Sequence, residues 1–246
     1  MKLVLLGTTG YHPNDRRETA CMMLPETGVV LDAGTGMYRL GEHLATNHLD
    51  IFLTHSHLDH VVGLTFLLEV LQGRDMQRVT VHGEPAKLAA VREHLYHELL
   101  FPVPPQFEFR PIATKTKLEG GGRLTWFPLV HPGGSIGFRL DWPGSSLAYV
   151  TDTTATPDAD YVQHIRGVDV LLHECYFADG NEAFAEKTGH SCTTPAAQVA
   201  QAAGVGRLIL VHVAPHSTAD DPIGLSTARA IFPATELAED NMEIEF

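Results

Sequence analysis

Four potential metal ligands follow one short hydrophobic run in this sequence. His55, His57, Asp59 and His60 come directly after Ile51-Phe52-Leu53, a run that predicts a buried strand. Neutral imidazole and carboxylate groups are the ligands that zinc and similar divalent ions accept in hydrolytic sites. In a loop that enters a helix at Asp59, His55 and His57 can face one ion while Asp59 and His60 face another. The segment therefore predicts a site for two metal ions.

Three further potential ligands occupy the same kind of position later in the chain. His131, Asp152 and His212 each come directly after a hydrophobic run that predicts a strand. Each alone would be an ordinary residue at a strand end, but strand ends are where α/β proteins place their sites, so the shared placement indicates ligands. We expect one metal to bind His55, His57 and His131, the other to bind Asp59, His60 and His212, and Asp152 to bridge both.

Strand and helix patterns mix along the whole chain. Strands are expected at 3–6, 29–31, 51–53, 79–81, 147–150, 168–172 and 208–211. Helices are expected over 59–71, 85–100 and 195–203. The proline-rich stretch 101–111, which holds Pro104 and Pro105, cannot be a regular helix and fits a linker between two halves. We predict an α/β layered sandwich that forms a single domain over residues 1–246.

Composition limits the partners of this chain. Its net charge of -13 repels polyanions and argues against a broad basic surface for nucleic acid. Its 15 histidines nearly equal its 17 lysines and arginines, which favours metal binding. The 3 scattered cysteines imply no disulfide framework and fit a reducing, cytoplasmic compartment. The first hydrophobic run stops at Gly7, too early for a signal peptide or a membrane span, so no membrane partner is expected.

The ligand series, in this order, resembles that of the metallo-β-lactamase superfamily. Within it, the sequence is most similar to the ribonuclease Z branch and its phosphodiesterase relatives. The motifs that carry the resemblance span nearly the whole chain: Leu6-Gly7-Thr8-Thr9-Gly10, Leu31-Asp32-Ala33-Gly34-Thr35-Gly36, His131-Pro132 with Gly137-Phe138-Arg139, Thr151-Asp152-Thr153, Leu172-His173-Glu174 and Gly189-His190-Ser191. The resemblance implies a four-layer αββα sandwich.

The resemblance also implies a catalytic role for three residues. Glu174 and His190 would form a hydrogen-bonded pair, with His190 near the leaving group of a scissile phosphate. A carboxylate beside an imidazole raises the pKa of the imidazole, which suits a general acid near neutral pH. Asp59 would orient or deprotonate the attacking water while it also holds a metal. The expected reaction is phosphodiester hydrolysis with two Zn²⁺ ions, and the same ligands accept Mn²⁺ or Fe²⁺.

One departure from the ribonuclease Z pattern concerns the substrate. Those enzymes usually carry a long arm for gripping tRNA before the bridging aspartate. Here only residues 140–151 separate Arg139 from Asp152, which is room for a hairpin and no arm. Cys175-Tyr176 also replaces the small residue and threonine usual after the glutamate. The missing arm and the negative net charge argue against tRNA and favour a small or cyclic nucleotide-type diester, and the changed loop after Glu174 indicates a different pocket.

Other functions stay open at this point. A thioesterase or lactonase of the glyoxalase II-like type shares the His-x-His-x-Asp-His series and the bridging aspartate. The His190 pair and the lack of an added helical region after His212 favour the phosphodiesterase, and a true β-lactamase would typically lack the bridging aspartate. From a different class, a non-catalytic metal-binding module would show gaps in the ligand set, and none is visible. Apolar helix faces permit a homodimer.

Overall fold

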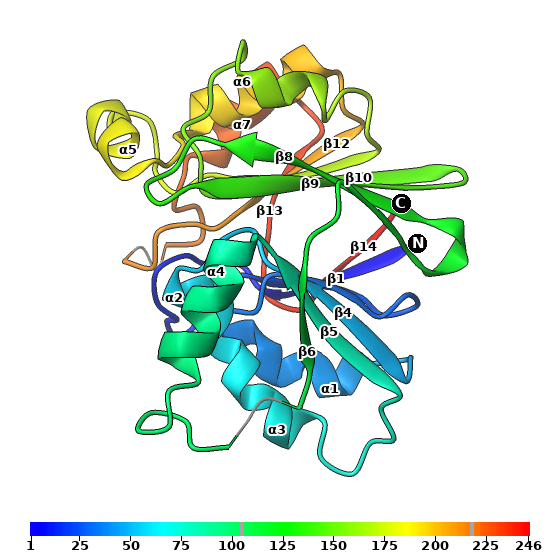
Figure 1. Ribbon diagram of the computed structural model, residues 1–246. Helices are drawn as coiled ribbons and strands as arrows, with labels where there is room; N and C mark the ends of the chain where they lie inside the picture. Colours follow the sequence, from blue (N-terminus) through cyan, green and yellow to red (C-terminus); the bar gives the residue numbers. More distant parts are fainter. Residues whose placement is uncertain (104–105, 217–218) are drawn as a thin grey trace. The chain divides into compact units, whose positions relative to one another are not determined.

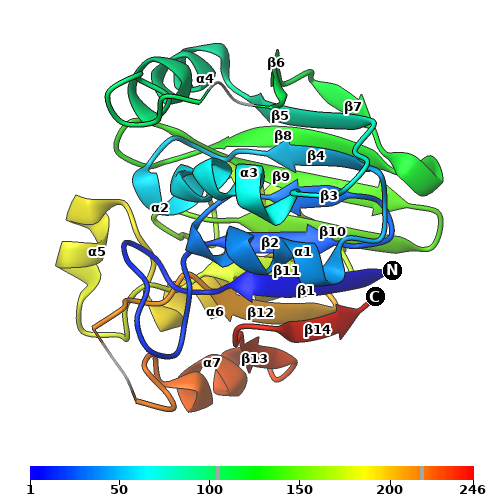
Figure 2. The same ribbon diagram turned by 90° about the horizontal axis from the view of Figure 1, so that it is seen from below.

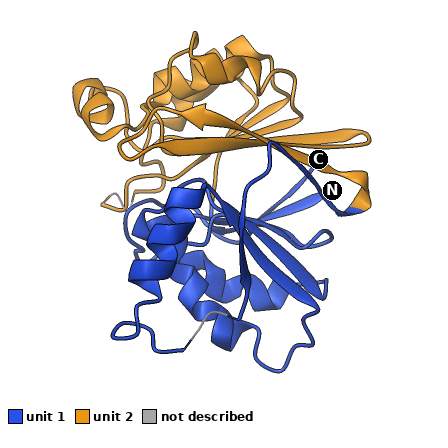
Figure 3. Cartoon of the chain, in the orientation of Figure 1, with its two compact units in different colours: residues 1–119, 239–245 blue, residues 120–238, 246 orange. Residues whose placement is uncertain are grey.

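The computed structural model describes residues 1–103, 106–216 and 219–246, which form two compact units (Figure 3). The first unit contains residues 1–119 and 239–245, and the second contains residues 120–238 and 246. The predicted linker at 101–111 is therefore wrong as a boundary. Strand β6 (Glu108–Pro111) pairs in parallel with β5 (Arg78–Gly83), and this pairing ties the stretch to the first unit. Pro104 and Pro105 lie outside the described residues.

A mixed sheet forms the first unit. Its strands follow the order β14 (Met242–Glu245), β1 (Lys2–Gly7), β2 (Cys21–Leu24), β3 (Val29–Leu31), β4 (His48–Phe52), β5 and β6. Strand β1 is antiparallel to both neighbours, β14 and β2. Because Lys2 at the start of β1 pairs with Glu245 at the end of β14, the two chain termini lie side by side (Figure 2). Strands β3 to β6 are parallel, so the loops after β3 and β4 leave the same edge of the sheet.

The helices of the first unit lie together on one face of its sheet (Figure 1). Val4 and Ile51 of the sheet belong to one buried core with Met37 and Leu64 of the helical segments. These segments are short: η1 (Thr35–Arg39), α1 (Leu40–His43), α2 (Leu58–Val61), η2 (Val62–Phe66), α3 (Leu67–Val70), α4 (Pro85–Ala90) and the π-helical turn η3 (Val91–Leu95).

The helix expected over 59–71 is broken into α2, η2 and α3. The break follows from backbone bonds to the loop after β3: Ala33 N donates to His60 O, and Gly63 N donates to Ala33 O, each at 2.8 Å. Because these bonds take groups that a continuous helix would use, the regular i to i−4 ladder cannot run through this turn. A Cβ on Gly63 would lie 2.1 Å from Gly34 O, so only glycine permits the close approach.

The second unit is built on another mixed sheet. Its strands follow the order β13 (Thr235–Leu237), β12 (Arg207–Val211), β11 (Val170–Glu174), β10 (Ser145–Val150), β9 (Ser135–Trp142) and β8 (Arg123–Leu129). Its helical segments are η5 (Asp160–Gln163), α5 (Glu182–Thr188), α6 (Thr193–Ala203) and α7 (Leu225–Ile231). Strand β7 (Lys115–Lys117) and the turn η4 (Glu119–Gly121) lie where the chain passes from the first unit to the second.

Strands β9 and β10 form the hairpin predicted between Arg139 and Asp152. Trp142 pairs with Ser145, and Gly144 takes a positive φ of 89° in the turn that joins them. The expectation of a hairpin without an arm is confirmed. All three cysteines are buried and free. Among the described residues, none of the helices has the length and apolar character that crossing a membrane requires.

Candidate metal centre and its catalytic residues

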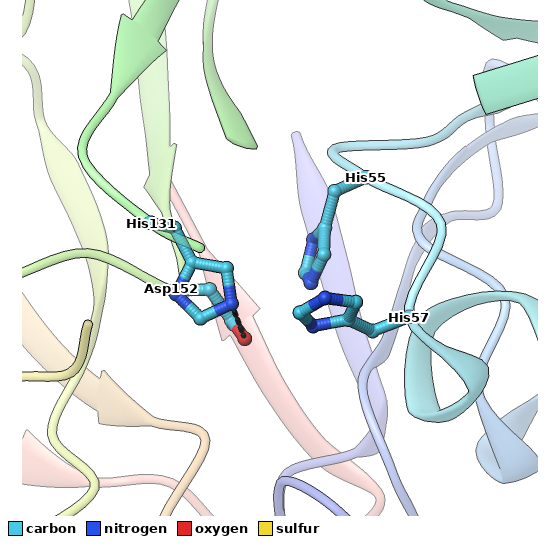
Figure 4. A group of neighbouring side chains, drawn as sticks. All are labelled: His55, His57, His131 and Asp152. Atoms are coloured by element: carbon cyan, nitrogen blue, oxygen red, sulfur yellow. Dashed lines mark ion pairs between the residues drawn. The ribbon is translucent and has the colours of Figure 1, made fainter. Parts of the chain in front are cut away.

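The predicted ligands of the first unit lie together on the loop after β4. The ring centroids of His55 and His57 are 4.5 Å apart, and those of His55 and His60 are 4.2 Å apart. His60 Nε2 lies 3.5 Å from Asp59 Oδ2. Figure 4 shows the His55 and His57 side chains extending from this loop with their rings close together. The structure thus brings these four side chains close together on one loop.

A buried carboxylate that the sequence analysis did not assign supports this cluster. Asp32 follows β3, is fully buried, and accepts a hydrogen bond from His60 Nδ1–H at 2.8 Å. Thr54 donates to Asp32 from its backbone N–H at 2.8 Å, and its Oγ1 lies 3.0 Å from His55 Nδ1. Metal-bound histidines commonly donate their other ring N–H to a carboxylate in this way. The signal that could have found Asp32 is its place directly after the 29–31 strand.

Asp59 is held by a second loop of the same unit. The backbone N–H of Tyr11 donates to Asp59 Oδ2 at 2.7 Å. Tyr11 has a positive φ of 63°, a conformation that non-glycine residues seldom adopt and that is concentrated at functional sites. This bond limits the rotation of the Asp59 carboxylate. The predicted role of orienting a water molecule requires a carboxylate that is fixed in this way.

Asp152 lies between two histidines in the second unit. His131, Asp152 and His212 follow β8, β10 and β12, as the hydrophobic runs predicted. Asp152 Oδ2 is 3.6 Å from His131 Nε2, drawn as a dashed line in Figure 4, and its Oδ1 is 3.3 Å from His212 Nε2. Each carboxylate oxygen therefore faces a different histidine, which is the arrangement that a bridging ligand needs. Asp152 and His212 also have positive φ angles of 35° and 57°.

Glu174 and His190 form the predicted hydrogen-bonded pair. His190 Nδ1–H donates to Glu174 Oε1 at 3.1 Å. Glu174 is fully buried at the end of β11 and also accepts bonds from the backbone N–H groups of Thr153, at 2.7 Å, and Ser191, at 3.2 Å. These donors fix the carboxylate, and the carboxylate in turn fixes one edge of the His190 ring.

His190 lies beside the predicted ligands of its own unit. Asp152, His190 and His212 each offer one donor atom, and these atoms all lie within 4.8 Å of one another. The His190 ring centroid is 5.6 Å from that of His212 and 5.2 Å from that of His131. An imidazole, a group able to exchange a proton near neutral pH, is therefore placed next to the carboxylate that is expected to bridge the metals.

Comparison with known proteins identifies the family. The family model described as Beta-lactamase superfamily domain matches residues 27–213. The chain belongs to the β-lactamase superfamily. It is 30% identical to Ribonuclease BN of Escherichia coli strain K12, which it matches over 98% of each chain. It is 29% identical to Ribonuclease Z of Synechococcus sp. strain CC9605, over 100% of this chain and 98% of that protein. The resemblance to the ribonuclease Z branch is confirmed.

The fold of this superfamily member agrees with a solved structure. The metallo-beta-lactamase fold protein YhfI from Bacillus subtilis aligns with a TM-score of 0.82 at 19% identity, over 99% of each chain. The predicted α/β metallo-β-lactamase fold is therefore confirmed. Together with the ribonuclease relatives, the fold establishes that the chain is a hydrolase of the superfamily. Its histidine and aspartate donors suit a divalent metal.

A substitution at Gly189 tests how tightly the predicted ligand His131 is packed. His131 Nδ1–H donates to Gly189 O at 2.9 Å, and Gly189 has a positive φ of 74°. A Cβ there would lie 2.8 Å from His131 Nδ1 and 2.4 Å from Pro132 Cδ. We expect Gly189→Ala to lower the free energy of unfolding, measured in urea, by more than the ~1 kcal/mol that the backbone conformation alone costs.

Gly204→Ala is the matched control for this substitution. Gly204 has a similar φ of 61° and also ends a helix, but a Cβ on it would meet nothing within 4 Å. We expect it to lose about 1 kcal/mol from backbone strain and to keep its full metal content. If both variants lost the same unfolding free energy, His131 and Pro132 would have to move aside for the added methyl group without cost, and the prediction would be wrong.

Burial of His173 predicts that the hydrolase loses stability in acid. It is fully buried, its Nδ1–H donates to Glu174 O at 2.7 Å, and its Nε2 accepts from Tyr161 Oη at 2.9 Å. Burial is the largest influence on its pKa and lowers it from the ordinary value of 6.5. Because the pKa is lower in the folded chain, the unfolded chain binds a proton at this residue more readily as the pH falls through 6.5, so stability falls with the pH.

The expected measurement is a pH series of urea unfolding. Between pH 7.5 and 5.5, wild type should lose more unfolding free energy than His173→Gln, which has no titrating group at this position. All other ionisable groups are the same in the two proteins, so the difference between the two slopes reports His173. Parallel slopes would contradict the prediction.

Proposed function

We propose that this hydrolase is a two-zinc phosphodiesterase acting on small or cyclic nucleotide-type diesters, its two units working as one catalytic domain. One Zn²⁺ would be held by His55, His57 and His131, the other by Asp59, His60 and His212, with Asp152 bridging both. The observation that carries the proposal is the position of His190, paired with Glu174 and within 4.8 Å of the donor atoms of Asp152 and His212.

The donor set fits this pair of metals. Imidazole and carboxylate are zinc ligands, and His60 and His131 each direct Nδ1–H to an acceptor, Asp32 and Gly189, which leaves Nε2 as the coordinating nitrogen. Mn²⁺ or Fe²⁺ would accept the same atoms. When bound, such cations supply water activation and charge neutralisation at the phosphate. This chemistry promotes diester hydrolysis near neutral pH.

The residues of the chain would supply the proton transfers and the orientation. Asp59, fixed by the Tyr11 N–H, would orient the attacking water or accept its proton. His190 would donate a proton to the departing alkoxide, because its Nδ1–H is committed to Glu174 and the ring is thereby oriented. Glu174 is buried and acts only through His190. This division of roles gives the attacking and leaving oxygens separate partners.

The small substrate is supported by the β9–β10 hairpin and by the net charge. No arm extends between Trp142 and Ser145, and the charge of -13 disfavours a long polyanion. The relatives are named ribonucleases, so an RNA substrate is the alternative that the experiment must include. Turnover of RNA in preference to small diesters would overturn the substrate part of the proposal and leave the phosphodiesterase part intact.

The test is a substrate panel with the zinc-loaded and the manganese-loaded protein. Bis(p-nitrophenyl) phosphate and 2′,3′- and 3′,5′-cyclic nucleotides should be hydrolysed, and a chelator should abolish the activity until metal is restored. A pre-tRNA, a thioester and a lactone complete the panel. Turnover of the thioester or lactone with the diesters untouched would assign the chain to the glyoxalase II-like type and overturn the proposal. Metal binding without any turnover would favour a non-catalytic module.

A further inference from the structure

An aromatic side chain outside the predicted site packs against His190. The ring centroids of Tyr176 and His190 are 4.5 Å apart and the rings are stacked, with an interplanar angle of 19°. Tyr176 also lies 5.7 Å from the His212 ring, centroid to centroid. We propose that Tyr176 is a positioning residue, which holds the plane of the His190 imidazole for proton transfer. This inference rests on the proposed role of His190 and goes beyond it.

The backbone around Tyr176 is held firmly enough for this role. Cys175 N donates to Val211 O at 2.9 Å, and Ala214 N donates to Tyr176 O at 3.1 Å, so the pairing of β11 with β12 continues past the strand ends. On its other side, Phe177 N donates to Ser191 O at 3.2 Å. The segment that carries Tyr176 is therefore bonded directly to the residue that follows His190, and the two rings share one rigid support.

The stacking supplies a restraint that Glu174 alone does not. The single bond from His190 Nδ1–H to Glu174 Oε1 fixes one edge of the ring, but the ring can still tilt about that edge. A stacked aromatic ring restricts this tilt because tilting would separate the two faces or press them together. With both contacts in place, the opposite nitrogen of His190 keeps one direction. Proton transfer depends on that direction, since the donor must lie within hydrogen-bond reach of the leaving oxygen.

The tyrosine ring, rather than its hydroxyl group, carries the inference. Tyr176→Phe keeps the stacked face and should retain wild-type kinetics. Tyr176→Leu keeps an apolar side chain at this position but has no planar face, so it removes the restraint on tilt.

The experiment compares Tyr176→Phe and Tyr176→Leu in the zinc-loaded enzyme with a cyclic nucleotide as substrate. Tyr176→Leu should lower kcat by about 3- to 10-fold with KM unchanged, the size that loss of an aromatic contact allows. In a His190→Ala background the same substitution should cause no further loss, because the residue it positions is gone. Phe184→Leu is the control, since Phe184 is 54% exposed and contacts Phe177.

A second readout does not depend on turnover. In protein with isotope-labelled histidine, the His190 ring protons should show an upfield ring-current shift in wild type and Tyr176→Phe, and lose it in Tyr176→Leu. Loss of the shift without any change in kcat would overturn the positioning role. Loss of zinc from Tyr176→Leu would also overturn it, by showing that the ring supports His212 instead. If no phosphodiester is hydrolysed by wild type, the proposed function fails separately from the stacking.

Discussion

Asp152→Ala should lower kcat/KM for bis(p-nitrophenyl) phosphate by on the order of 1,000-fold or more. Loss of one group that stabilises charge in a transition state costs about 100- to 1,000-fold, and this substitution would also remove a ligand shared by both metals. The two Asp152 oxygens lie 3.6 Å from His131 Nε2 and 3.3 Å from His212 Nε2. Alanine leaves these two histidines without the carboxylate between them. The enzyme should therefore also bind less zinc, which metal analysis after gel filtration would measure.

Asp141→Ala is the matched control for this loss. Asp141 is a carboxylate of the same unit, on strand β9, and it pairs with Arg139 at 2.9 Å and with Arg123 at 3.4 Å on the surface. Surface pairs of this kind contribute little to stability, about 0–1 kcal/mol, so the variant should keep its zinc and its activity. An Asp152→Ala protein with full zinc content and near wild-type turnover would exclude Asp152 as the bridging ligand.

The strand ends that carry the candidate ligands could be predicted because a hydrophobic run precedes each of these segments. Strands β4, β8, β10 and β12 end one to three positions before His55, His131, Asp152 and His212. A run of buried residues marks a strand, and chain connectivity then places the next polar residue at its end. The local pattern therefore gave both the α/β class and the candidate site.

The supporting contacts could not be predicted in the same way, because they join residues that are distant in sequence. Asp32 and His60 are 28 positions apart and meet because β3 pairs in parallel with β4, with Leu31 opposite Phe52. No local sequence pattern predicts the register in which β3 and β4 pair. Tyr176 and His190 are likewise distant in sequence and meet beside the bridge between Phe177 and Cys192. Tertiary pairing decides these contacts, and it also broke the helix expected over 59–71.

His190→Ala should have an effect that depends on the leaving group. General acid catalysis contributes about 100- to 10,000-fold when the departing oxygen needs a proton. A ribose alkoxide needs one, so kcat for a cyclic nucleotide should fall by about 100-fold or more. A p-nitrophenolate ion departs unprotonated, so bis(p-nitrophenyl) phosphate should lose far less. The kcat losses for the two substrates, measured at saturating substrate, are then compared. An effect on metal binding would slow both substrates alike, so the ratio of the two losses reports proton donation.

Glu174→Gln provides the comparison that separates orientation from proton transfer. The amide still accepts a bond from His190 Nδ1–H, but it carries no charge to stabilise a protonated imidazole. We expect it to show the same leaving-group dependence as His190→Ala, with a smaller loss for the cyclic nucleotide. If His190→Ala instead slowed both substrates equally, His190 would act on the metal ligands within 4.8 Å of it, and not on the leaving group. The dependence on the leaving group therefore decides whether the Glu174 and His190 pair is an acid or a support for the metals.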